Sequence, residues 1–431
     1  MCRVCFIIPP RPWLVNPHAQ APMGILYLAA VLETEAGHDV SIVNLGGRYA
    51  GWDDVCSLPC ADVFCLSGTW LDVPEINSLA EAIYEFEPGV RILVGGPIAL
   101  SPDELSDNID LVVQGEAETE ICTLVESQSI GFHTCAPPTD LDALPFPARH
   151  LWAGPFGGNV FIGGENYFGG GSTTILSSRG CPYNCAFCAS SALAPRKVRF
   201  RSAESVVEEM EQCVVDFGVR QFRFSDENFN ANPSRVNALC GAIAVSDILG
   251  HGNGIAWRAS IAVRPRSTEL FQYMAATGCK EVSIGVESAD PKVLELLCPA
   301  KLPDPAESME ALQMAQDAGL KTRALMIIGT PGENADTSWH NRDFFQSAPC
   351  DALAVAIFTP MPGSDIYHHP ERYHCRLRSE MERQGQYLYG PQGRNPIEPA
   401  IELDDFPFDA LRASMAAQVA AAEATGKTGR G

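Results

Sequence analysis

The sequence has no apolar run long enough to cross a membrane, and it has few basic residues. Its longest smooth apolar segment, MGILYLAAVL (23–32), covers about half of the ~20 residues that a membrane helix needs. Lys and Arg number 30 against 53 Asp and Glu, which gives a formal net charge of −23. A surface of this charge repels phosphate backbones, and the densest basic stretch, PRKVRFR (195–201), is too small to offset it. The composition therefore argues against a membrane protein and against a nucleic-acid partner.

The sequence also lacks a recognisable secretion signal. The first residues, MCRVCFIIPP, hold one Arg and a short apolar run that ends at a proline pair, which is typical of a β-strand. We therefore expect a cytoplasmic protein. Its 431 residues suit two or three domains, and 46% hydrophobic content is typical of a globular chain. Most of the 16 cysteines should be buried small hydrophobes, so a tight cluster of them indicates a metal site.

Strand and helix patterns alternate over the first 130 or so residues. The apolar runs are continuous and rich in β-branched residues, as in strands that are buried on both faces of a parallel sheet. They cover residues 3–9, 39–45, 62–68, 91–97 and 110–116. The helical pattern of 22–38 begins with a proline and has a glycine at its end, and 73–89 follows the same logic. This predicts a doubly wound, Rossmann-like α/β domain that binds its ligand at the carboxyl ends of the strands.

A second α/β region follows a segment rich in proline, acidic residues and glycine. The six apolar runs of this region cover residues 173–180, 220–229, 255–263, 280–288, 322–333 and 351–363. Six β–α units predict a partial (β/α)6 barrel, with its chemistry at the carboxyl ends of the strands. We expect an N-terminal domain over 1–135, a linker over 136–172, the barrel over 173–365, and a short helical C-terminal cap and tail over 366–431.

Three cysteines, Cys181, Cys185 and Cys188, follow the first run of the barrel with the spacing C-x3-C-x2-C. A structural zinc site needs four ligands, but no second cysteine pair lies nearby, and His150 and His251 stand alone in the sequence. A four-iron cluster normally takes four thiolates, so three leave one iron open for a small molecule. The spacing therefore favours a cluster that delivers one electron to a ligand bound at the open iron.

The cysteine motif, with the aromatic Phe187 before its last cysteine, resembles that of the radical S-adenosylmethionine (radical SAM) superfamily. The resemblance extends through the barrel, about residues 173–365. It implies a [4Fe-4S] cluster on the three cysteines and S-adenosylmethionine as the ligand of the open iron. In this family, reduction cleaves the sulfonium and yields a 5′-deoxyadenosyl radical that abstracts a hydrogen atom from the substrate.

Three further segments resemble the S-adenosylmethionine-binding motifs of the family. RFSDENF resembles the second-strand motif that holds the methionyl ammonium, although it departs from the plain Gly-Gly-Glu form; its candidates are Ser225, Asp226 and Glu227. SIGVES resembles the segment that meets the ribose, with Glu287 and Ser288 as candidates. MIIGTPGE resembles the segment that lines the adenine, with Gly329 and Pro331 as candidates. Each residue could instead be a polar or turn residue with a purely structural role.

The N-terminal domain has no G-x-G-x-x-G after its first run, which argues against a dinucleotide cofactor. Segments 22–40, 95–97 and 112–118 instead resemble the cobalamin-binding domain of one radical SAM subfamily, and 141–152 resembles the linker of that subfamily. A D-x-H-x-x-G motif is missing, so the resemblance implies cobalamin without a histidine on cobalt. The alternative is a vestigial domain that binds no cobalamin.

The resemblance also suggests where cobalamin would be bound. Residues 9–20 would wrap its edge, and His18 is more simply a solvated loop residue than a cobalt ligand. Ser67, Thr69, Trp70 and Leu71 would face the lower side of the corrin, Gly95 and Gly96 would admit its nucleotide tail, and Gly115 and Glu116 complete the candidate set. The segment YHHPERYHC (367–375) could bind a metal but fits better as a loop that roofs the barrel.

Together these features predict a cobalamin-dependent radical SAM methyltransferase that acts on an unactivated carbon of a small-molecule substrate, with flavodoxin or ferredoxin as electron donor. The same cofactors could instead drive cyclisation, ring contraction or rearrangement without net methylation. A tRNA methylthiotransferase fits less well, because it needs a second cysteine triplet and a basic C-terminal domain. A non-catalytic cobalamin carrier or sensor would leave the three cysteines without a role.

Overall fold

The computed structural model divides the chain into two compact units, one over residues 1–158 with 192–194, the other over 159–191 with 195–431. The residues that the structure describes are 1–11, 21–46, 55–152, 161–194, 196–249, 254–301, 304–379 and 397–428. Within these ranges, no helix combines the length and the apolar character that crossing a bilayer requires. All 16 cysteines are free, and nine of them are buried, as the sequence predicts.

The first unit is built on a six-stranded parallel sheet with the order β2-β1-β3-β4-β5-β6. Its strands are β1 (Arg3–Ile8), β2 (Asp39–Asn44), β3 (Val63–Ser67), β4 (Arg91–Gly95), β5 (Leu111–Gln114) and β6 (Gly131–Thr134). The chain leaves β1 toward β2 on one side and returns to β3 on the other side, so the predicted doubly wound topology is confirmed. Strand β6 was not predicted, because this short edge strand has no continuous buried run.

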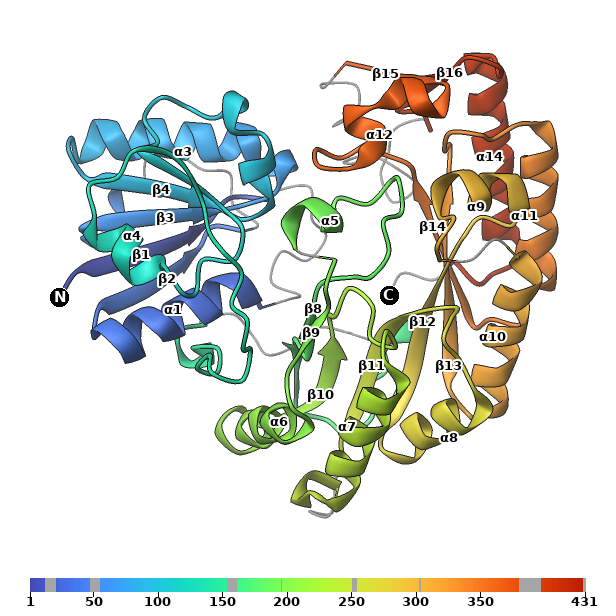
Figure 1. Ribbon diagram of the computed structural model, residues 1–431, viewed down its shortest axis with the longest axis horizontal. Helices are drawn as coiled ribbons and strands as arrows, with labels where there is room; N and C mark the ends of the chain where they lie inside the picture. The colour runs from blue at the N-terminus through green and yellow to red at the C-terminus, as the bar shows by residue number, and fades with distance from the viewer. Residues whose placement is uncertain are drawn as a thin grey trace. The chain divides into compact units, whose positions relative to one another are not determined.

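Helices cover both faces of this sheet (Figure 1). Helix α3 (Val73–Phe86) lies on one face, and its Ile76 and Leu79 join the core that β1, β3 and β4 form. Helices α1 (Met23–Ala36) and α4 (Ile121–Glu126) lie on the other face. Gly37 ends α1 in the left-handed conformation with φ 61°, as the sequence predicts for a glycine at a helix C-terminus.

The second unit is a six-stranded parallel half-barrel with the order β14-β13-β12-β11-β10-β7. Its strands are β7 (Gly171–Ile175), β10 (Val219–Phe224), β11 (Ala256–Ala262), β12 (Cys279–Glu287), β13 (Lys321–Ile328) and β14 (Ala352–Ile357). Each corresponds to one of the predicted apolar runs, so the partial barrel is confirmed, and its first strand begins two residues before the predicted Thr173. A two-stranded ribbon, β8 (Ser178–Arg179) and β9 (Arg199–Phe200), follows the first strand.

Helices on the outside of the barrel connect its strands (Figure 1). They are α6 (Ala203–Phe217), α7 (Pro233–Val245), α8 (Thr268–Ala276), α9 (Pro291–Leu297), α10 (Pro305–Asp317) and α11 (Ala335–Ser347). Two short helices, α5 (Ser190–Leu193) and α12 (Asp365–His368), lie beside the cysteine loop and not in this outer layer. Helix α6 shows the local signals that set helix boundaries: Ser202 caps its first turn by accepting the Ser205 N–H at 3.1 Å, and Gly218 ends it. The C-terminal region contains helix α14 (Phe408–Ala424) and, beyond the expected helical structure, an antiparallel pair, β15 (Cys375–Leu377) and β16 (Ile401–Leu403).

A buried charge cluster lies among the barrel strands together with the segment that precedes β7. Glu281 is fully buried, accepts the Ile162 N–H at 2.6 Å and pairs with Arg258 at 3.1 Å. Lys321, near the start of β13, pairs with Glu165 of the same preceding segment. These contacts fix the segment against the barrel at the ends of the strands opposite to those that carry the candidate site.

A buried hydrogen-bond network attaches helix α14 to the barrel. The Asn341 side-chain amide donates to Gln418 Oε1 at 2.7 Å, and Gln418 Nε2 donates to Glu333 Oε2 at 3.3 Å. Glu333 also accepts the Thr330 N–H at 2.9 Å, which closes the turn after β13. Burial raises the pKa of Glu333 to about 7. The C-terminal helix therefore supports the turn that the sequence analysis predicts to line the adenine of S-adenosylmethionine.

This buried carboxyl group should make the stability of the protein fall as the pH rises. The pKa of Glu333 in the folded protein is about 7, against an ordinary value of 4.5, so its protonated form stabilises the fold fully below pH 4.5 and ceases to do so above pH 7. The loss amounts to on the order of 3 kcal/mol. Chemical denaturation at pH 4.5 and pH 8 should show a smaller pH dependence for Glu333→Gln than for wild type. Equal pH dependence in the two proteins would show that this group is not responsible.

Candidate functional site

The second unit contains a cavity of about 770 Å³, a volume that includes the space open to solvent at its mouth. It lies at the carboxyl end of the barrel, where parallel α/β barrels hold their active sites. It is lined by Cys181, Tyr183, Asn184, Cys185, Phe187, Cys188, Ser190, Ser191, Glu227, Asn228, Ser260, Ile261, Ala262, Gly285, Glu287, Lys301 and Leu325.

The three predicted cysteines line this one cavity. Cys181, Cys185 and Cys188 are each partly buried and none is disulfide-bonded. A turn in which the Cys188 N–H donates to the Cys185 carbonyl at 3.0 Å brings the last two together. Phe187, the aromatic residue of the motif, lines the same cavity. The loop therefore presents three thiols, and not a closed set of four, to a space that can hold a ligand.

Neighbouring elements hold the cysteine loop from several sides. The Ala186 N–H donates to the Leu297 carbonyl at 2.8 Å, and the Ala186 carbonyl accepts the Ile366 N–H at 3.1 Å. At the start of the loop, the Gly180 N–H donates to Glu227 Oε2 at 3.2 Å. The loop is thus tied to the end of α9, to α12 and to the segment after β10.

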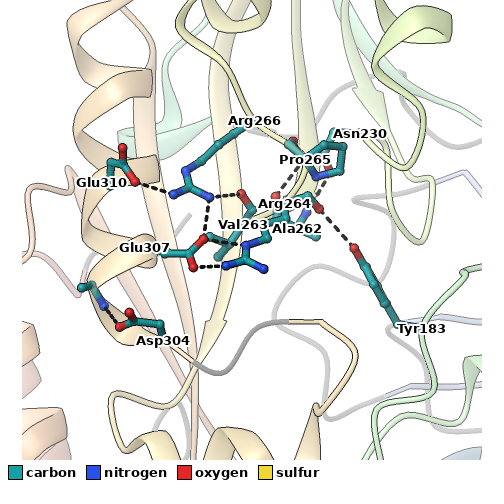
Figure 2. A network of polar contacts seen from close by, with 11 residues as sticks. Tyr183, Asn230, Ala262, Val263, Arg264, Pro265, Arg266, Asp304, Glu307 and Glu310 are labelled. Carbon is teal, nitrogen blue, oxygen red and sulfur yellow. Dashed lines mark hydrogen bonds and ion pairs between the residues drawn. The ribbon is translucent and has the colours of Figure 1, made fainter.

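A fourth contact ties the loop to the turn that follows β11, which Figure 2 shows. The Tyr183 hydroxyl donates to the Arg264 carbonyl at 3.2 Å. Asn230 holds this turn by donating to two of its carbonyls, at 2.9 and 2.7 Å. On the other side, Glu307 of α10 accepts from Arg264 Nε at 2.6 Å and from Arg266 at 2.9 Å (Figure 2). Asn230 and Glu307 hold the turn from two sides, so the Arg264 carbonyl is a fixed acceptor for the Tyr183 hydroxyl.

A fourth cysteine, Cys298, lies against the loop although it is 110 positions from Cys188. It packs in the same buried cluster as Cys185, next to the hydrogen bond that joins Ala186 and Leu297. A hydrogen bond from the Cys298 thiol lowers the pKa of Cys185, and the positive charge of Lys301 lowers it further against the opposing effect of burial. Because Cys298 donates, its own pKa is raised. Cys185 is therefore the thiol of this pair that ionises first.

Lys301 and Glu287 form an ion pair at the wall of the cavity. Both side chains are largely buried, and Glu287 adopts an unusual backbone φ of 67° at the end of β12. Burial alone would lower the pKa of Lys301, but the negative charges of Glu287 and Cys185 outweigh it, so the pKa of Lys301 is raised. The cavity thus holds a permanent positive charge beside the thiols.

The structure places only some of the predicted S-adenosylmethionine residues at the cavity. Glu227 and Glu287 line it. Asp226 does not: it is buried and accepts the Ser177 N–H at 2.8 Å and the Ser178 hydroxyl at 2.7 Å, so it fixes the start of the cysteine loop. Ser225 does not line the cavity, and Ser288 is buried beside it, where its hydroxyl bonds Asn341 at 3.4 Å.

The predicted adenine segment also lies outside the lining residues of the cavity. Gly329 has φ 78°, and a Cβ there would lie 2.7 Å from Met415 Sδ of helix α14. The glycine is thus required by backbone conformation and by close packing of the C-terminal helix. Pro331 is buried in the following turn, which Glu333 holds.

Several lining residues have no motif that could have revealed them. Lys301 lies between α9 and α10, and Tyr183 and Asn184 lie between the cysteines. Ser260 is on β11, where an inward-facing polar residue in a buried strand was the one available signal. These residues reach the cavity because the fold brings together the ends of four strands and two loops.

In the first unit, the loop after β3 is held by one buried carboxylate. Asp72 is fully buried and accepts from the Thr69 N–H at 2.8 Å and from its hydroxyl at 3.1 Å. Arg11, which follows β1, donates to the same carboxylate at 2.8 Å. The ion pair therefore joins the loops that follow β1 and β3, the two strands between which the winding of the sheet reverses.

The remaining cobalamin candidates also follow the strands of this sheet. Trp70 and Leu71 are buried in a single turn of 3-10 helix, Trp70–Asp72, after Ser67 at the end of β3. Gly96, next to Gly95, has φ 87°, and a Cβ there would lie 2.9 Å from Ser67 Oγ. Gly115 has φ 96° and packs against the Cys135 carbonyl, with the partly exposed Glu116 next to it.

The sequence also singles out His18 and the histidine segment 367–375. His18 lies in residues 12–20, outside the described residues. In the segment 367–375, His368 Nε2 accepts the Gly363 N–H at 3.2 Å, and Cys375 is buried against the core that contains Cys185. Among the described residues, the group of side chains that could hold a metal does not include this segment.

Comparison with protein families matches residues 175–345 to the Radical SAM superfamily. A protein of Pyrococcus horikoshii named as an uncharacterized methyltransferase is 27% identical over 377 residues, which cover 81% of this chain and 78% of that protein. The cytidylyl-2-hydroxyethylphosphonate methyltransferase of Streptomyces wedmorensis is 24% identical over 246 residues, which cover 53% of this chain but only 43% of that enzyme.

Among solved structures, the radical S-adenosylmethionine methyltransferase TsrM from Kitasatospora setae, determined with cobalamin and a [4Fe-4S] cluster bound, has a similar fold. The TM-score is 0.70 at 18% identity, and the match covers 97% of this chain and 88% of that protein. At this identity the match establishes the architecture, a doubly wound sheet followed by a half-barrel.

Removing the hydrogen bond from Cys298 should raise the pKa of Cys185 in the cluster-free protein. The hydrogen bond is the largest influence that lowers this pKa. The rate of Cys185 alkylation as a function of pH, localised by peptide mapping, should therefore shift to higher pH in Cys298→Ala. Cys298→Ser keeps a donor of similar size and should stay close to wild type. Identical pH profiles in all three proteins would contradict the assigned hydrogen bond.

Proposed function

The barrel of this chain belongs to the radical SAM superfamily, and we propose that the protein is a cobalamin-dependent methyltransferase that acts on an unactivated carbon of a small molecule. The observation that carries the proposal is the cavity at the carboxyl end of the barrel, with three thiols, two carboxylates and one lysine in its walls. The methyltransferase names of the Pyrococcus and Streptomyces proteins support the reaction class.

The cysteine loop fits a [4Fe-4S] cluster with one open iron. Three thiols from one loop line one cavity, and Cys298 contributes to an adjacent packing cluster and not to the cavity wall. The lowered pKa of Cys185 favours the thiolate that metal binding requires. When bound, the cluster supplies the electron that cleaves the sulfonium of S-adenosylmethionine. The role of the chain is to hold Cys181, Cys185 and Cys188 toward the open side of the cavity.

The charged residues of the cavity fit the methionyl part of S-adenosylmethionine. Glu227 would hold the ammonium, because a carboxylate pairs well with a cation. Lys301 would face the carboxylate, and Glu287 would accept from the ribose hydroxyls. The ion pair with Glu287 raises the pKa of Lys301 and fixes both side chains in a largely buried wall, so the site is oriented before the ligand arrives.

The first unit fits cobalamin at the carboxyl edge of its sheet. Doubly wound sheets bind ligands where the winding reverses. Here that point lies between β1 and β3, and the pair formed by Arg11 and the buried Asp72 shapes the two loops beside it. Ser67, Thr69, Trp70 and Leu71 would contact the corrin, with Gly95, Gly96, Gly115 and Glu116 along the tail. When bound, cobalamin supplies the methyl group.

The substrate and the redox partner follow from this chemistry. An unactivated carbon has no lone pair with which to attack a sulfonium, so a hydrogen atom must be removed before the methyl group can be added. The cluster needs one electron for each cleavage, which implies a one-electron donor of the flavodoxin or ferredoxin type. The net charge of −23 disfavours a polyanionic substrate.

The proposal is tested by the products that the anaerobic, cobalamin-loaded protein forms from S-adenosylmethionine and a chemical reductant. Methyl donation releases S-adenosylhomocysteine, and reductive cleavage releases 5′-deoxyadenosine, so a methyltransferase of this kind should form both. In Cys185→Ala, cluster iron and 5′-deoxyadenosine should fall to background, while cobalamin stays bound. Cys56→Ala changes an exposed cysteine of the first unit and should match wild type in every measurement.

Each departure from this result has a distinct meaning. 5′-Deoxyadenosine without S-adenosylhomocysteine would overturn methylation in favour of a radical cyclisation or rearrangement. Cobalamin binding without either product would indicate a carrier or sensor. A Cys185→Ala protein that is iron-loaded and active would refute the assignment of the cluster.

Replacing Trp70 should weaken cobalamin binding. The indole is 4% exposed in the loop after β3, so Trp70→Ala leaves a void that disturbs the loop as well as any ring contact. We expect roughly three- to tenfold weaker binding by equilibrium dialysis and an altered visible spectrum. Trp70→Phe fills most of the void and should lie between wild type and Trp70→Ala. A folded Trp70→Ala protein with unchanged affinity and spectrum would place cobalamin elsewhere.

A further inference from the structure

Three side chains of metal-binding type converge in the first unit, away from the switch point between β1 and β3. They are Glu120, which directly precedes α4, and His133 and Cys135, at the end of β6. One potential ligand atom from each lies within 4.8 Å of the other two. We propose that these three residues bind a divalent transition-metal ion of the zinc type.

Strand geometry and hydrogen bonds fix the positions of the three proposed ligands. His133 and Cys135 are two residues apart on extended chain, so both project from the same face of the sheet. The extension continues through Cys135, because its N–H donates to the Gln114 carbonyl at 2.8 Å. Glu120 is oriented at both oxygens: Oε2 lies 2.8 Å from His133 Nε2, and Oε1 accepts the Ala136 N–H at 3.0 Å.

The ligand set suits zinc chemically. A thiolate, an imidazole nitrogen and a carboxylate oxygen are the three groups that proteins use for Zn²⁺, and three protein ligands leave a fourth position for water. The surroundings attract a cation, because the carboxylates of Glu120 and Glu118 both act electrostatically on the Cys135 side chain. A bound cation would replace the thiol proton and offset this negative charge.

The site is reachable from solvent. The His133 and Glu120 side chains are 38% and 33% exposed, whereas Cys135 is buried behind them. An ion can therefore enter past two partly exposed ligands and meet the thiol at the inner end. An ion pair of Glu120 and His133 accounts for two of these side chains, and the Cys135 thiol adds a third ligand atom within 4.8 Å of both.

The position suggests what the metal would do. It would connect the segment between β5 and α4 to the end of β6. Gly115, at the start of that segment, already packs on the Cys135 carbonyl, since a Cβ there would lie 2.9 Å from the carbonyl oxygen. Because three protein ligands leave the fourth zinc position open, a bound ion would bridge these two segments as an open site, unlike the four-ligand structural sites. This inference does not depend on the proposed function.

The test is a zinc titration of the anaerobic, cluster-loaded protein, read as bound Zn²⁺ per chain by elemental analysis after equilibrium dialysis. Wild type should bind one equivalent more than Cys135→Ser. Wild type and Cys135→Ser have all other cysteines in common, so this difference is expected whether or not a cluster occupies Cys181, Cys185 and Cys188. His133→Ala and Glu120→Gln should weaken zinc binding by roughly tenfold or more, since even supporting residues of metal sites contribute that much.

The matched control is Cys122→Ala, a partly buried cysteine on α4 close in sequence to Glu120 but outside the proposed site. It should bind zinc as wild type does. Titration with Co²⁺ gives a second readout, because a thiolate ligand produces a sulfur-to-cobalt absorption band that Cys135→Ser should lose. If Cys135→Ser fails to fold, zinc binding by His133→Ala and Glu120→Gln tests the proposal, because both residues are partly exposed. Equal zinc binding in wild type, His133→Ala and Glu120→Gln would overturn the proposal.

Discussion

The candidate site depends on the anchoring of a loop that has almost no regular structure of its own. Between β8 and α5, the cysteine loop takes its shape from hydrogen bonds to its surroundings: Ala186 to Leu297 and Ile366, and Gly180 to Glu227. These partners belong to segments far apart in the sequence, so the three thiols can converge only when the barrel is complete. The geometry of the candidate site is therefore a product of tertiary structure and not of the loop alone.

Charge compensation is the second constraint on this cavity. Three thiolates and two carboxylates would repel one another in a partly buried space, and Lys301 is the cation among the residues that line it. Its ion pair with Glu287 and its effect on Cys185 connect the two halves of the site, the one that would hold a cluster and the one that would hold a zwitterionic ligand. The first unit uses the same device, because the buried charge of Asp72 is balanced by Arg11.

Helix α14 carries no recognised motif, yet its side chains support a segment that the sequence analysis assigned to cofactor binding. Its Gln418 reaches Glu333 in the turn after β13 and Asn341 on α11. Its Met415 packs where Gly329 leaves room. The glycine and the acid of the GTPGE segment thus have structural partners in the C-terminal helix, which the motif alone does not indicate. Helix α14 contacts this segment directly, whereas the residues that line the cavity do not include Gly329 or Glu333.

The sequence by itself determined the elements and their order. Local hydrophobic pattern, capping residues and spacing, which act over a few residues, predict eleven of the twelve strands in the two six-stranded sheets, the ends of α1, the cysteine triplet and the change from one α/β unit to the next. Strand β6 was missed because its side chains are largely exposed and carry no such pattern. Tertiary structure alone decided that Glu227 and Glu287 line the cavity whereas Asp226 and Ser288 do not. It also decided that Lys301 and Cys298 meet Cys185, and that Cys135 meets Glu120. These contacts join residues that are distant in the chain, and the geometry that brings them together exists only once the parallel strands are paired and their carboxyl ends share one edge.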